Sequence, residues 1–66
     1  MAEPSAAARD IDLARRALAT GTLTARQEQV CRARLADPDA NWELIAHRTG
    51  LTEDEVAAAF TAAVQA

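Results

Sequence analysis

Capping and turn residues divide this chain into short helical segments. Thr24 with Gln27, and Thr52 with Glu55, have the spacing of a capping box. In a capping box the threonine oxygen accepts the third helical amide, while the longer side chain reaches back to the cap amide. Gly21 follows a stretch with helical periodicity, where a glycine ends a helix well. Because these signals are closely spaced, each helix is expected to have about three turns. The sequence shows no strand pattern.

A proline turn and a glycine corner separate the remaining segments. Pro38 disfavours helical backbone at the residue before it, so Asp37-Pro38-Asp39 predicts a turn. Asn41 is a good N-cap for the next helix. Gly50 permits a sharp exit, with an expected positive φ. The chain is therefore predicted to be all-α, a small four-helix domain over residues 6–66. The helices are expected at about 6–19, 25–36, 42–49 and from 53 onward, after a flexible tail at 1–5 that Ser5 ends as a cap.

Apolar residues at helical spacing define the expected core. They are Ala7, Ile11, Ala14 and Leu18 in the first helix, Leu23, Val30, Cys31 and Leu35 in the second, Trp42, Ile45, Ala46 and Thr49 in the third, and Val56, Ala59, Phe60, Ala63 and Val64 in the fourth. Eighteen of the 66 residues are alanine and only two are aromatic, so the helices should pack closely around a thin core. A domain this small is marginally stable unless its helices are well formed or a partner supports it.

Charge is distributed unevenly along the chain. Residues 9–34 hold six arginines and three carboxylates, whereas residues 37–66 hold one arginine and six carboxylates. No run of 18 apolar residues predicts a membrane span. The N-terminus lacks the basic and then apolar order of a signal peptide, and the chain has a single cysteine. These features favour the reducing cytoplasm.

Few residues could support catalysis or bind a metal. Cys31 is expected in the core and His47 on the surface, and two such ligands are too few for a structural zinc site. Nucleophilic catalysis needs a base within reach and a third group to orient it, and the chain offers no such set. We therefore expect no enzyme activity, no metal, no cofactor and no small-molecule substrate.

Residues 41–64 read as two helices around the corner 49–51, the layout of a helix-turn-helix. From Leu23 to Val64 the sequence resembles the tetrahelical helix-turn-helix domains of LuxR-type response regulators and of sigma-factor region 4. The resemblance rests on residues 23–27 with Val30, on 41–46, on 50–53 and on Val56. Residues 35–40 are also similar to the helix-turn-helix of the WhiA sporulation regulators. The resemblance implies a helix-turn-helix whose second helix exposes the binding face.

In those families the outward face of the second helix supplies the DNA contacts. The corresponding positions here are Ala57, Ala58, Thr61 and Ala62, followed by Gln65. Alanine offers base edges only a methyl group, and the helix begins with three carboxylates, which would repel phosphates. This face is either an ordinary solvated surface or a docking face for a partner helix, with Leu44 as an exposed anchor. We favour a regulatory protein-protein module: a homodimer, a partner of the transcription machinery or a docking domain.

The alternative is a DNA-binding transcription regulator that acts as a dimer. It would contact phosphates through Arg26, Arg32, Arg34 and Arg48, all expected on outer faces. Thr61 and Gln65 would be its only polar base readers. The competing interpretation of the arginines is a solvated face with local ion pairs to nearby carboxylates.

Overall fold

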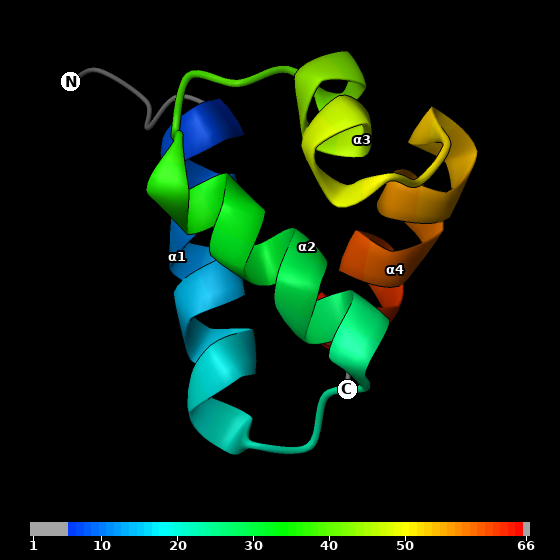
Figure 1. The fold of residues 1–66 in the computed structure, drawn as a ribbon. Coiled ribbons are helices and arrows are strands. Elements are labelled where there is room, and N and C mark those ends of the chain that lie inside the picture. Colours follow the sequence, from blue (N-terminus) through cyan, green and yellow to red (C-terminus); the bar gives the residue numbers. More distant parts are fainter. Residues whose placement is uncertain (1–5, 66) are drawn as a thin grey trace, which may run out of the picture.

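The computed structural model describes residues 6–65, and within that range every regular element is a helix. The helices are α1 (Ala6–Thr20), α2 (Ala25–Ala36), α3 (Trp42–Thr49) and α4 (Glu53–Gln65) (Figure 1). The all-α prediction is thus confirmed for this part of the chain, with helix ends within one residue of those expected. The predicted tail at 1–5 and its cap Ser5 lie outside the described residues.

The helix ends follow from local hydrogen bonds that the sequence encodes. The Thr24 hydroxyl accepts the Gln27 amide at 3.2 Å, and Gln27 Oε1 accepts the Thr24 amide at 3.0 Å. At the start of α3, Asn41 Oδ1 accepts the Leu44 amide at 2.8 Å. Such caps satisfy amides that have no partner inside the helix. The predicted starts of α2 and α3 are therefore confirmed together with their cause.

The corner after α3 requires glycine. Gly50 has φ 74°, in the left-handed region where residues with a Cβ are strained. Its amide donates to the Ala46 carbonyl, and the Leu51 amide donates to the same oxygen at 3.1 Å. These bonds close the end of α3 and turn the chain into α4 within three residues.

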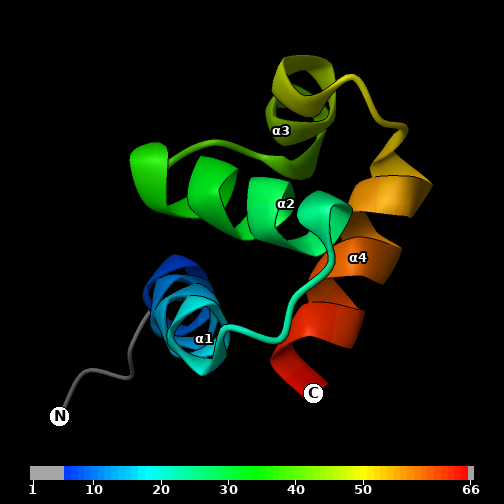
Figure 2. The ribbon, with the colours of Figure 1, turned by 60° about the horizontal axis from the view of Figure 1, so that its bottom comes forward.

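The helices pack with α2 and α4 at the centre. Each of these two contacts every other helix, whereas α1 and α3 do not contact each other. Figure 2 shows α1 and α3 on opposite sides of α2. The buried apolar residues between the helices are Ala14, Ala17, Val30, Cys31, Ala40, Ile45, Ala46, Val56, Ala59, Phe60 and Ala63. Six of these eleven are alanine, so close helix approach takes the place of large side chains.

Most of the residues expected in the core are buried or half-buried. Ile11, Leu18, Leu23, Leu35, Trp42, Thr49 and Val64 are only half-buried, and the side chain of Ala7 lies outside the described set. Sequence periodicity missed two buried alanines, Ala17 and Ala40. Cys31 is fully buried, as expected, and burial raises the pKa of its thiol.

The placement of Arg34 on the outer face of α2 was wrong. This side chain is only 4% exposed, and it folds back beneath the loop that follows α2. Its Nη2 donates to the carbonyls of Asp37 (3.2 Å), Pro38 (3.4 Å) and Ala40. The guanidinium carbon lies 5.2 Å from the ring centre of Trp42, in cation-π geometry. Arg34 therefore fixes the α2–α3 loop and has no free face for a phosphate.

Candidate interaction surface

The outward face of α4 is a surface of small side chains. Ala57, Ala58, Thr61, Ala62 and Gln65 are all exposed, as predicted, while the opposite side of the helix supplies the buried seam. We call these five residues the α4 face. The helix has no basic residue in its last turn. The α4 face therefore offers close approach to another helix and no cation for a phosphate.

The start of α4 carries the acidic cap predicted from the sequence. The Thr52 hydroxyl accepts the Glu55 amide at 3.1 Å, and Glu55 Oε1 accepts the Thr52 amide at 3.0 Å. Glu55 Oε2 also lies 3.3 Å from Arg26 Nη1 of α2. The hydrogen bonds from Thr52 lower the pKa of Glu55, and the Arg26 charge lowers it further. One carboxylate thus begins α4 and ties it to the start of α2.

This arrangement predicts an acid-sensitive contribution to stability. Because the folded state lowers the pKa of Glu55, the ionised group stabilises the fold above its unfolded pKa. That contribution is lost as pH falls through the folded pKa. We expect Glu55→Gln to lower the free energy of unfolding at pH 7, and we expect this effect to shrink as pH falls through the folded pKa and to vanish once Glu55 is protonated in both states. Urea titrations from pH 3 to pH 7 measure the difference, with Glu53→Gln as the matched control. A Glu55→Gln effect that is the same at every pH would contradict this assignment.

Leu44 lines a hollow to which the α4 face does not contribute. It is 36% exposed and lines a shallow hollow of about 450 Å³ together with Asn41, Glu43 and His47. All of these residues belong to α3 or to its cap, and no α4 residue lines the hollow. The exposure predicted for Leu44 and for His47 is confirmed. The structure does not bring Leu44 and the alanines of α4 into one pocket.

The remaining arginines of the phosphate-contact set are exposed but already paired. Arg32 Nη2 lies 2.5 Å from Glu28 Oε1 one turn earlier in α2. Arg48 Nη1 lies 3.0 Å from Asp37 Oδ2 in the α2–α3 loop. With Arg26 held by Glu55, all three exposed cations have a carboxylate partner. A phosphate would have to compete with these carboxylates, which weakens the electrostatic basis for DNA binding.

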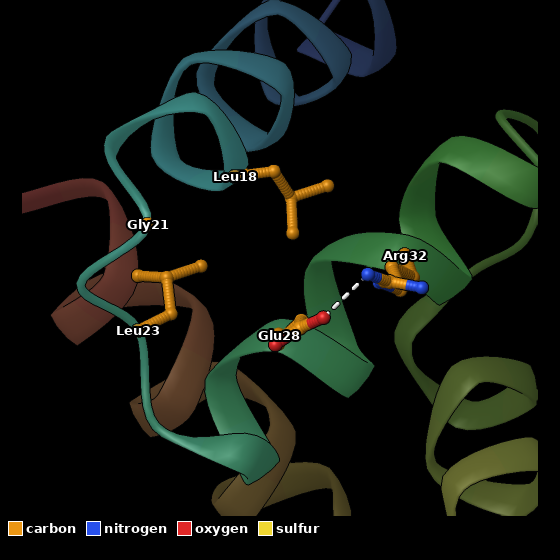
Figure 3. Close-up of a pocket in the computed structure, with 5 residues that line it drawn as sticks. All are labelled: Leu18, Gly21, Leu23, Glu28 and Arg32. Carbon is orange, nitrogen blue, oxygen red and sulfur yellow. Dashed lines mark ion pairs between the residues drawn. The ribbon is translucent and has the colours of Figure 1, made fainter.

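A groove between the end of α1 and the start of α2 was not anticipated from the sequence. It has a volume of about 400 Å³ and is lined by Leu18, Gly21, Leu23, Glu28 and Arg32. Figure 3 shows the two leucines on one side and the Glu28–Arg32 ion pair on the other. The groove arises where two helices diverge, which helical periodicity within one segment does not reveal.

The described residues hold no cluster of metal-ligating type. No group of three His, Cys, Asp or Glu side chains converges among residues 6–65. Within the same range, no helix combines the length and apolar character that crossing a bilayer requires. The described residues offer a partner an exposed helix face and shallow hollows such as those at Leu44 and between α1 and α2.

Comparison with protein-family models, with curated proteins and with solved structures finds no match to this chain.

Proposed function

We propose that this chain is a non-catalytic regulatory module of the helix-turn-helix type that acts through protein-protein contact. Its helix-turn-helix would be α3, the Gly50 corner and α4. In support, α3 and α4 are short, are joined by only three residues, and pack directly on each other. The α4 face then occupies the position that reads DNA in domains this chain resembles.

One observation carries the choice of protein over DNA. The α4 face exposes small side chains and no cation, while the exposed arginines Arg26, Arg32 and Arg48 are held by carboxylates. Small residues let the backbones of two helices approach closely, whereas base readout needs donors and acceptors that reach into a groove. The carboxylates Glu53 and Asp54 at the exposed helix start would steer the module toward a basic partner surface.

Enlarging the α4 face should abolish partner binding without unfolding the domain. A bacterial two-hybrid screen with this chain as bait identifies binding proteins. We expect Ala58→Arg and Ala62→Glu to reduce the recovered interactions at least about tenfold, because both positions are exposed and any helix packed there would clash. Ala36→Arg, the same change at an exposed alanine of α2, is the matched control. Partners that bind Ala58→Arg and wild type equally well would refute the assignment of this face.

The runner-up function is DNA binding by a dimer, supported by the exposure of Arg26 and Arg48 near the α3–α4 corner. It is tested by fluorescence anisotropy with a labelled random duplex at about 50 mM salt, where electrostatic binding is strongest. We expect no binding at tens of micromolar, on the order of non-specific affinities. Binding that falls steeply with salt would reverse this choice. In that event Arg26→Ala and Arg48→Ala should each reduce the salt slope by about one unit.

A further inference from the structure

Two apolar surface features lie at opposite ends of the fold. Leu44, at 36% exposed, is the most exposed large apolar side chain among the described residues, and it lies near the start of α3. The groove formed by Leu18 and Leu23 lies beside the α1–α2 turn. In Figure 1 the start of α3 is at the top of the molecule and that turn is at the bottom. Leu44 lines a different hollow from the groove, so it does not fill the groove of its own chain.

The charges at the two ends are complementary. Glu43 lies beside Leu44, and Asp39 is exposed in the loop just before α3. Arg32 lines the groove together with its ion-pair partner Glu28, and on the second half of α1 Arg15 and Arg16 are exposed, Arg16 being paired with Asp12. The two ends belong to the halves of the chain that carry net charges of opposite sign, with an excess of three arginines in residues 9–34 and of five carboxylates in residues 37–66. Unlike ends therefore attract, whereas two α3 ends repel each other.

We infer that a second copy of this chain is the partner at these ends, with Leu44 of one copy seated in the Leu18–Leu23 groove of the next. Glu43 would then face Arg32 of the neighbouring copy, in competition with Glu28. The inference rests on the proposed protein-protein function, and it names the partner at Leu44, the residue expected from the sequence to be an exposed anchor. It leaves the α4 face free for a different protein.

A contact of this kind joins two different surfaces and is heterologous. Repetition of a heterologous contact gives a ring if the rotation closes and an open chain if it does not. The buried surface is small, so association should be weak and should increase with concentration. We expect the average mass from sedimentation equilibrium to rise above that of the monomer between about 20 μM and 1 mM.

Two variants, each defective at one end, test the inference sharply. Leu44→Ala removes the apolar side chain at the third residue of α3 without adding a charge, and alanine suits a helix. Arg32→Glu reverses the charge at the groove, and its side chain is 71% exposed, so the fold should survive. Each variant alone should remain monomeric up to about 1 mM. An equimolar mixture of the two variants should form dimers, because the Leu44 variant keeps an intact groove and the Arg32 variant keeps an intact Leu44. Nothing larger should form, because such a dimer has no second intact surface with which to bind a third copy.

Several outcomes would overturn the inference. A wild-type chain that is monomeric at about 1 mM has no such contact. A mixture that stays monomeric, with circular dichroism showing both variants folded, excludes pairing between these two ends. Dissociation of the wild-type assembly by Ala58→Arg would move the self-contact to the α4 face. If the mixture of variants forms no dimer while Ala58→Arg still abolishes binding to the screened partners, the proposed function stands. In that case only the contact between Leu44 and the groove is wrong.

Discussion

Replacing Arg34 with alanine is expected to lower the free energy of unfolding by about 3 kcal/mol, because hydrogen bonds from a charged group are each worth about 1.5–3 kcal/mol. Arg34 is 4% exposed, and its guanidinium donates to three loop carbonyls, those of Asp37, Pro38 and Ala40. Without it, the buried Ala40 carbonyl loses this donor and the α2–α3 loop loses its anchor, although the Asp37 carbonyl still accepts the Ala40 amide. A domain of this length has a total stability of roughly 3–10 kcal/mol, so the variant should lose between about a third and all of it.

Chemical denaturation followed by circular dichroism and by Trp42 fluorescence measures this effect. Arg32→Ala is the matched control on the same helix, since its side chain is 71% exposed and its ion pair with Glu28 spans one helical turn. The control should change the free energy of unfolding by no more than about 0.5 kcal/mol. Arg34→Lys should recover only part of the loss, because a single ammonium cannot match the planar guanidinium over the Trp42 ring. Equal effects of the two alanine substitutions would show that Arg34 is not the anchor of the loop.

Arg34 also shows where sequence reasoning stops for this fold. The helix ends were predictable because each depends on residues a few positions apart, as with Thr24 and Gln27. The burial of Arg34 depends on how the next loop folds back over the end of α2. A helical wheel assigns the side chain to the polar face of its own helix and contains no information about that loop. Ala40 was missed for the same reason. It is buried although it lies in the α2–α3 loop, where helical periodicity makes no prediction.

The candidate surfaces were predicted to different degrees. The exposure of the α4 face was predictable from the apolar residues that the same helix buries, because the residues on the opposite side must point outward. The separation of Leu44 from that face depends on how α3 crosses α4, and the sequence does not specify that angle. The Leu18–Leu23 groove requires the divergence of α1 and α2. The ion pair between Arg26 and Glu55 likewise joins residues that are distant in the chain. Features set by one helix were thus predictable, and features set between helices were not.

Truncation of Phe60 to alanine is the second change expected to have a large effect, with a loss of about 3–5 kcal/mol. Phe60 is 6% exposed, and its ring centre lies 5.2 Å from that of Trp42, with the two planes inclined by 57°. This tilted aromatic pair joins α4 to α3, and Arg34 covers the same Trp42 ring. The surrounding core is mostly alanine, so few neighbouring side chains can move to fill the cavity left by the phenyl ring.

The expected loss can be separated from a general sensitivity of α4 to substitution. Phe60→Leu keeps most of the volume and should cost less than half as much, while Thr61→Ala, at the exposed neighbouring position, should cost about 0.5 kcal/mol or less. Urea denaturation followed by Trp42 fluorescence reports on the aromatic pair directly. Because Arg34 and Phe60 both pack on Trp42, Arg34→Lys and Phe60→Leu should not be additive when combined. Strict additivity would show that Arg34 and Phe60 are not coupled through Trp42, and a cost below about 1 kcal/mol for Phe60→Ala would show that α4 is held mainly by its alanine contacts.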